Sequence, residues 1–399
     1  MKLTTSIKTT HLRLYQNSLL HLKSEVVSSY KNDVQNVELV QYYGYPIEVH
    51  ADIQTEDGYL LTMHRIPHGK SNGDQKDKKV ALLMHCLVCS SAVYALNGPE
   101  RSLAFILADQ GYDVWMPNAR GNVFSKKHIT LDPQDDADKF WRFSWHEIGY
   151  YDVPASIDYI QAKTGVEKMS YIGYSQGTTS FYVMASSRPE YNDKISVAIS
   201  LAPIGYMSHM TESFLVYLSE HIDALNEFSE MLGWHELLPN YELMGPLIKW
   251  CQGSGQQLCD DAFSLILGQS ISDLDDNLTP VILTHLPAGS AAKQWVHYGQ
   301  EIQSGFFRRF DFGLVGNLAE YGNATPPNYD LSKITAPTAF LYGDKDSFAH
   351  VDDVAQMLSE LPNVVFERLM EGYGHGDFVF IENATIVVKE LVLDILDNY

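Results

Sequence analysis

Short apolar runs alternate with helical stretches over two parts of the chain. The run VALLMH at residues 80–85 is apolar throughout, as expected for a strand buried on both faces of a sheet. Further runs of this kind predict strands at 112–118, 169–175, 197–203, 336–342 and 364–370. Helices are predicted at 101–110, 152–164 and 178–187, and residues 47–66 predict two strands around a turn at 56–58. Strands that alternate with helices predict an α/β fold with a mostly parallel central sheet covered by helices.

This alternation breaks between residues 206 and 330. The segment shows helical periodicity, with apolar residues from Phe214 to Leu232 on one face, and it holds Trp234, Trp250 and Trp295. We therefore predict one α/β core interrupted by a largely helical cap. The predicted parts are an N-terminal extension at 1–32, a first core part at 33–205, the cap at 206–330 and a second core part at 331–399.

Charge narrows the set of partners. The 399 residues include 28 basic and 50 acidic side chains, which gives a formal net charge of −22. Such a charge repels phosphate backbones and anionic lipid head groups, so nucleic acid is not an expected partner. No run of about 18 apolar residues is present, so no transmembrane segment is predicted. An uncharged substrate remains compatible with the net charge of −22. The first 24 residues lack the apolar stretch that is typical of a secretory signal.

The pentapeptide Gly173-Tyr174-Ser175-Gln176-Gly177 carries the strongest chemical signal. It lies between a predicted strand and a predicted helix, and G-x-S-x-G in that setting is typical of a nucleophile elbow. The tight turn requires small residues beside the serine, and the following helix directs backbone N–H groups at developing negative charge. Ser175 is the predicted nucleophile.

A serine nucleophile needs a base and a carboxylate that orients the base, in the chain order Ser, acid, His in such folds. The acid should follow a late strand, where Asp344 and Asp346 both occur; we favour Asp346, because the turn can aim it at the site. His375 lies in a glycine-rich loop, Gly372–Gly376, between the last strand and the last helix. The backbone N–H groups of Gln176 and Leu87 are the predicted oxyanion donors.

The four cysteines give no metal or cofactor prediction. Cys86 and Cys89 form a C-x-x-C, but a zinc site needs two further ligands that the sequence does not supply. We expect both to be buried thiols, since free cysteine commonly behaves as a small apolar residue. Cys251 and Cys259 are eight residues apart, a spacing compatible with a local disulfide.

Several of these segments resemble the acid lipases, a group that includes gastric and lysosomal lipases and many insect relatives. The resemblance covers residues 33–399 and rests on MHCLVCSS, SLAFILADQGYDVWMPNARGN, GYSQGTT, THLPAGS, YGDKDSFAHVDDV and YGHGDF. It implies an α/β-hydrolase fold with a helical cap, and hydrolysis of triacylglycerols or sterol esters through an acyl-enzyme at a lipid–water interface. It supports Ser175, Asp346 and His375 as the triad, with Leu87 and Gln176 as donors.

The same resemblance implies a secreted or lysosomal protein with a Cys251–Cys259 disulfide in the cap. Asn277, Asn323 and Asn383 lie in N-x-T sequons and are candidate glycosylation sites. One position departs from the family, which usually has glycine where this chain has Cys86. Two alternatives stay open: an esterase for small soluble esters, and a catalytically silent lipid-binding protein on a lipase scaffold.

Overall fold

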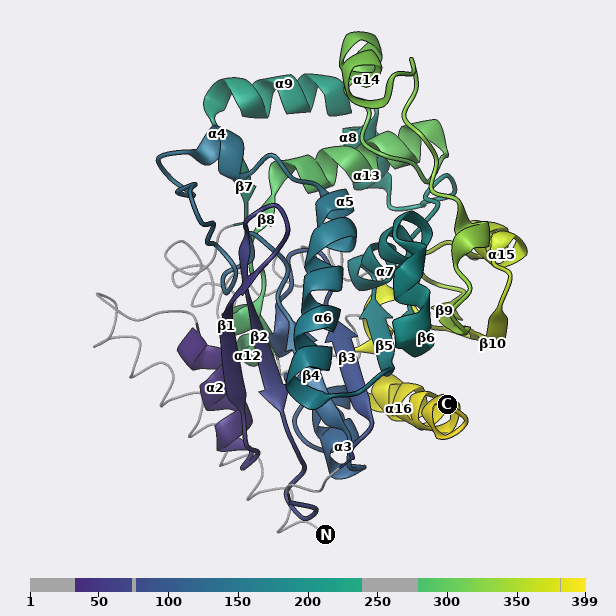
Figure 1. Cartoon of the computed structure of the whole chain (residues 1–399). Helices are drawn as coiled ribbons and strands as arrows, with labels where there is room; N and C mark the ends of the chain where they lie inside the picture. The colour runs from purple at the N-terminus through teal and green to yellow at the C-terminus, as the bar shows by residue number, and fades with distance from the viewer. Residues whose placement is uncertain (1–32, 74–76, 239–278, 381) are drawn as a thin grey trace, which may run out of the picture.

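A twisted central sheet organises the computed structural model, which describes residues 33–73, 77–238, 279–380 and 382–399. In these residues the sheet has eight strands in the order β1-β2-β4-β3-β5-β6-β9-β10 (Figure 1). Their bounds are β1 Glu48–Gln54, β2 Leu60–Ile66, β3 Val80–Met84, β4 Asp113–Pro117, β5 Met169–Tyr174, β6 Ile195–Leu201, β9 Thr338–Gly343 and β10 Val364–Met370. Each matches a run predicted from the sequence to within a few residues.

The direction of the strands decides where a site can form. β2 pairs antiparallel with β1 and with β4, whereas all neighbours from β4 to β10 pair in parallel. The prediction of a mostly parallel α/β sheet is therefore confirmed. Since parallel strands end at the same edge of the sheet, loops that follow β3, β5, β9 and β10 meet there.

Alternation along the strands divides the core into two layers. In β3, Val80, Leu82 and Met84 belong to one buried cluster, while Ala81 and Leu83 belong to a second cluster on the other face. The first cluster contains apolar residues of α6 (Val153–Thr164), α7 (Gln176–Ser187) and α15 (Val351–Glu360). The second contains residues of α2 (Asp33–Tyr42), α3 (Leu103–Asp109) and α16 (Glu382–Asp397). Both faces of the sheet are thus covered by helices, which explains the continuous apolar runs.

The described part of residues 206–330 is mostly helical. Its elements are α8 Ser213–Ser219, α9 Ile222–Leu232, β7 Glu236–Leu237, α12 Thr279–His285, β8 Ser290–Ala291, α13 Ala292–Ser304 and α14 Gly313–Tyr321. α8, α9, α13 and α14 lie together at the top of Figure 1, and α13 packs against α8 and α9. α12 differs, because Val281 and Ile282 join the core cluster shared with α2 and α3.

Shorter elements connect these layers. They are α4 Ala137–Phe140, α5 Trp145–Glu147, a π-helical turn at Ile148–Asp152, and 3₁₀ turns at Ser91–Tyr94, Pro189–Lys194, Leu331–Lys333 and His375–Phe378. The last of these turns begins at the histidine singled out in the sequence.

Candidate active site

Ser175 lies in a sharp turn between β5 and α7. Its backbone has φ 53° and ψ −120°, a conformation that residues with a side chain rarely adopt. Glycines on either side permit the turn: a Cβ on Gly177 would lie 2.1 Å from the Met84 carbonyl oxygen, and one on Gly173 would lie 2.7 Å from the Gly177 carbonyl carbon. The motif therefore folds into the strand–turn–helix that its glycines predicted.

Three polar side chains from separate strand ends meet at this turn. The Nε2 atom of His375 lies 2.8 Å from Ser175 Oγ, and its Nδ1 lies 2.8 Å from Asp346 Oδ2. Asp346 and His375 are buried, whereas Ser175 is partly exposed. Since Asp346 accepts at Nδ1, the neutral imidazole places its proton there and leaves Nε2 free to accept from the serine hydroxyl. The arrangement can deprotonate a serine as it attacks a substrate.

Asp346 and His375 are each fixed by further hydrogen bonds. The second carboxylate oxygen of Asp346 accepts from the backbone N–H groups of Phe348 at 2.9 Å and Ala349 at 2.8 Å. The Tyr174 hydroxyl donates to the His375 carbonyl oxygen at 3.0 Å. Burial, together with the charge of Asp346, raises the pKa of Tyr174 well above its ordinary value, so the hydroxyl keeps its proton. Nothing in the sequence pattern pointed to this role of Tyr174.

The two candidate acids are in different environments. Asp344 is exposed, and it accepts from the Gly372 N–H at 2.6 Å and pairs with Lys345 at 3.3 Å. Its hydrogen bond to Gly372 lowers the pKa of Asp344, which fits a role in closing the loop before His375. Of the two aspartates, only Asp346 is hydrogen-bonded to His375.

Of the two predicted oxyanion donors, Gln176 lies at the start of α7 and Leu87 lies in the loop after β3. Gln176 is the first residue of α7, where a backbone N–H has no partner within the helix. The loop containing Leu87 follows β3, whose last carbonyl group touches Gly177. In the part of the chain that the structure describes, the Leu87 N–H donates no hydrogen bond.

The prediction that Cys86 and Cys89 are free thiols is wrong. The structure joins them in a disulfide with the Cα atoms 5.2 Å apart. A tight turn with Val88 at φ 54° allows this approach, and the Cys89 N–H donates to the Cys86 carbonyl at 3.2 Å. Cys86 itself does not have a positive φ, so replacing the usual glycine does not place a cysteine in the left-handed region. The C-x-x-C spacing was the signal that could have revealed the bond.

The helix α13 reaches directly to the start of α7. Gln176 Nε2 donates to Gln294 Oε1 at 2.9 Å, and the hydroxyls of Thr179 and Tyr298 lie 3.0 Å apart. His297 of the same helix stacks on Trp145 with 3.6 Å between ring centroids. The side chain that follows Ser175 is thus hydrogen-bonded to α13.

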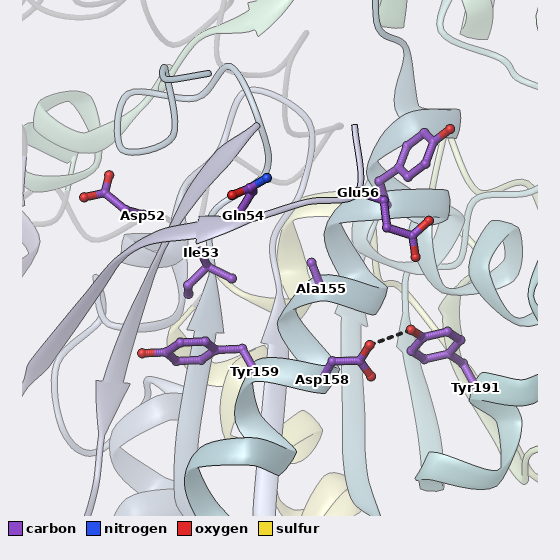
Figure 2. A pocket seen from close by; sticks show the side chains of 9 residues that line it. Asp52, Ile53, Gln54, Glu56, Ala155, Asp158, Tyr159 and Tyr191 are labelled. Atoms are coloured by element: carbon purple, nitrogen blue, oxygen red, sulfur yellow. Dashed lines mark hydrogen bonds between the residues drawn. The ribbon is translucent and has the colours of Figure 1, made fainter. Parts of the chain in front are cut away.

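A surface pocket of about 330 Å³ lies elsewhere, between β1 and α6. Figure 2 shows its tyrosines and carboxylates, with Asp158 accepting from the Tyr191 hydroxyl at 2.8 Å. Its acidic residues are already paired, Asp52 with Lys127 and Glu56 with Arg188. None of the three triad candidates lines this pocket, so it is separate from the site at Ser175.

The remaining predicted positions fall in different places. Cys251, Cys259 and Asn277 lie outside the described residues. Asn323 is exposed just after α14, and Asn383 lies in the first turn of α16. Within the described ranges no group of three or more His, Cys, Asp or Glu side chains gathers as a metal site. No helix there is long and apolar enough to cross a membrane.

Comparison with known proteins identifies the family. A family model described as a partial alpha/beta-hydrolase lipase region matches residues 36–98, and the alpha/beta hydrolase fold model matches residues 82–229. Lipase 3 of Drosophila melanogaster is 42% identical over 375 residues, which cover 91% of this chain and 92% of that protein. Gastric triacylglycerol lipase of Rattus norvegicus is 37% identical over 353 residues, 87% of each chain. The chain belongs to the acid lipase family.

This acid lipase also shares its fold with more distant enzymes. A soluble variant of monoglyceride lipase from Saccharomyces cerevisiae superposes with a TM-score of 0.51 at 15% identity, over 89% of this chain and 98% of that one. Such a likeness concerns the fold alone, and it confirms the α/β-hydrolase class. The family membership confirms the predicted resemblance and the prediction of a carboxylic ester hydrolase of the lipase type.

Proposed function

We propose that this acid lipase hydrolyses esters of neutral lipids, triacylglycerols or sterol esters, with Ser175 as nucleophile, His375 as base and Asp346 as its orienting acid. The observation that carries the proposal is the continuous hydrogen-bonded chain from Ser175 Oγ through His375 to Asp346, with 2.8 Å at each step. Three residues at the ends of β5, β9 and β10 have no structural need to meet in this order. A catalytic triad requires it.

The proposed reaction proceeds in two halves. Ser175 Oγ attacks the ester carbonyl carbon while His375 Nε2 takes its proton, and the oxyanion accepts from the Leu87 and Gln176 N–H groups. Collapse of this intermediate breaks the bond to the alcohol, which leaves with the proton from His375. Water then attacks the acyl-enzyme with His375 again as base, and the fatty acid is released. Asp346 holds Nδ1–H and stabilises the imidazolium that forms in each half.

Features of residues 206–330 favour a lipid as the substrate. We propose that residues 206–330 form a cap that receives acyl chains, since α13 contacts Gln176 beside the nucleophile. On the outer side, Leu314, Val315 and Leu318 of α14 are 63%, 81% and 51% exposed. Met231 at the end of α9 is also largely exposed. The three exposed apolar residues of α14 lie close together on one short helix, and such a patch favours contact with an apolar partner, which here is the lipid–water interface.

Three further observations support a secreted or lysosomal location. Disulfides such as Cys86–Cys89 persist mainly in oxidising compartments. The sequon at Asn323 lies on an exposed turn, where a glycan can be accommodated. A gastric lipase among the relatives supports the same location.

A panel of substrates tests the proposal. Purified enzyme and its Ser175→Ala variant would be measured on a soluble butyrate ester, an emulsified long-chain triacylglycerol and a sterol ester. We expect the highest kcat/KM on a long-chain lipid and almost no turnover by the variant. Preference for the butyrate ester would favour the small-ester hydrolase. Absence of turnover on every ester, with lipid still bound, would favour a silent lipid-binding protein.

A further inference from the structure

In the loop after β3, one disulfide links Cys86 to Cys89 and so spans Leu87. The bond between Cys86 and Cys89 closes a small ring that contains only Leu87 and Val88 in addition to the cysteines. Both cysteines are buried, with 6% and 3% of their surface exposed. Because Leu87 is the proposed second oxyanion donor, the ring encloses the donor itself.

The peptide between Cys86 and Leu87 is held through its carbonyl oxygen. This oxygen accepts from His85 Nδ1 at 2.8 Å and from the Cys89 N–H at 3.2 Å. A trans peptide is planar, so the N–H of Leu87 points away from the Cys86 carbonyl. Whatever fixes that oxygen therefore also fixes the direction of the Leu87 N–H.

His85 has a defined protonation state in this arrangement. Its Nε2 accepts from the Ala119 N–H at 3.0 Å, so the single ring proton must be on Nδ1, where it donates to the Cys86 carbonyl. Burial lowers the pKa of His85 to about 4, which keeps the ring neutral over a wide pH range. The loop is thus braced from the strand side by a neutral histidine.

At Val88, the other residue inside the ring, the loop is held by one backbone hydrogen bond. The Val88 carbonyl accepts from the Ala288 N–H at 2.6 Å, and Val88 itself has φ 54°. A β-branched residue is strained at positive φ, so the turn needs a further constraint to persist. The disulfide supplies that constraint, because it holds the two ends of the turn together.

We propose that the Cys86–Cys89 disulfide is a positioning element of the oxyanion hole, which holds the Leu87 N–H toward the oxyanion that develops at Ser175. The inference rests on the proposed function, because it takes Leu87 as a donor. It makes turnover sensitive to reduction. A dithiol would transfer two electrons and two protons to the disulfide, leaving two thiols on the protein and a disulfide in the reductant.

The Cys86→Ser/Cys89→Ser variant tests this proposal. Loss of one oxyanion donor lowers kcat by about 10²- to 10³-fold, and a displaced donor should cost less, roughly 10- to 100-fold. KM for a soluble ester should stay within about twofold, since a donor used only in the transition state does not bind the ground state. Val387→Ser, at an exposed position of α16, is the control and should retain the parent kcat. A general loss of structure would instead change KM and the melting temperature together.

Reduction of the parent enzyme gives a second measurement that does not depend on folding of a variant. Dithiothreitol would be added to folded enzyme, and kcat compared with the alkylation of Cys86 and Cys89 seen by peptide mass mapping. We expect activity to fall as these two thiols appear and to return on reoxidation. Full activity in the serine pair, both thiols appearing without loss of activity, or two alkylatable cysteines before reduction would each overturn the proposal. An active Ser175→Ala variant would overturn the proposed function instead.

Discussion

The site around Ser175 and the exposed side of α14 differ in how their side chains are held. Each candidate catalytic side chain is hydrogen-bonded, whereas Leu314, Val315 and Leu318 of α14 are exposed to solvent. Asp346 accepts three hydrogen bonds, one of them from His375, and is buried. Val315 is 81% exposed. A reaction needs groups held within a fraction of an ångström, while contact with a fluid lipid surface needs only exposed apolar area. Substitutions should therefore have very different effects in the two regions.

The largest effect is expected at Ser175, the proposed nucleophile. Ser175→Ala should lower kcat by about 10⁴- to 10⁶-fold, because the triad acts as a unit and the remaining groups cannot form an acyl-enzyme. A phosphonate ester should label the parent at Ser175 and leave the variant unlabelled. An unchanged melting temperature would show that the loss is chemical. Turnover near the parent level would refute the assignment.

The next largest effect separates the two aspartates. Asp346→Asn should lower kcat by about 10⁴-fold, since His375 loses the acceptor that sets its tautomer. Asp344→Asn is the matched control, because that side chain is exposed and bonds Gly372 rather than the histidine. It should keep activity within a few-fold of the parent. Equal losses in both variants would contradict the division of roles.

The outer surface should respond more weakly and selectively. Leu314→Ser/Val315→Ser should lower activity on emulsified long-chain lipid by about tenfold, since two side chains lose about 1.4 kcal/mol or more of favourable burial at the interface. Activity on a soluble butyrate ester should not change. Val387→Ser on α16, which lies at the opposite end of the molecule in Figure 1, is the matched control and should affect neither substrate. If both activities fall in parallel, α14 does not contact lipid.

The smallest effect concerns stability of the helix beneath that surface. Burial raises the pKa of Glu301 in α13 well above its ordinary value near 4.5, and Arg308 opposes this only in part. Above pH 4.5 the folded state therefore holds a proton that the unfolded state releases, so the free energy of unfolding falls as pH rises. Glu301→Gln should raise the melting temperature by a few degrees at pH 7 and by less at pH 4.5. Glu320→Gln, which is exposed on α14, should show no such dependence on pH.

The sequence predicted those parts whose causes are local. The apolar run at 80–85 and the glycines around Ser175 indicated β3 and the sharp turn, because burial on two faces and close backbone approach each require particular residue types. The Cys86–Cys89 bond depends on Val88 adopting a positive φ, which a β-branched residue disfavours, so local rules argued against it. The hydrogen bond between Gln176 and Gln294 joins residues 118 positions apart, and no local sequence pattern predicts such a contact. The role of Tyr174 in holding His375 was missed for the same reason.

The backbone of Ser175 has a consequence for how such an enzyme can be improved. At φ 53° and ψ −120°, glycine would fit without the strain that serine carries, which is of order 1–3 kcal/mol. Selection for heat resistance alone would therefore favour a glycine here and enrich inactive protein. If Ser175 is the nucleophile, activity rather than stability accounts for serine at this position. A library screened by melting temperature should leave residue 175 fixed.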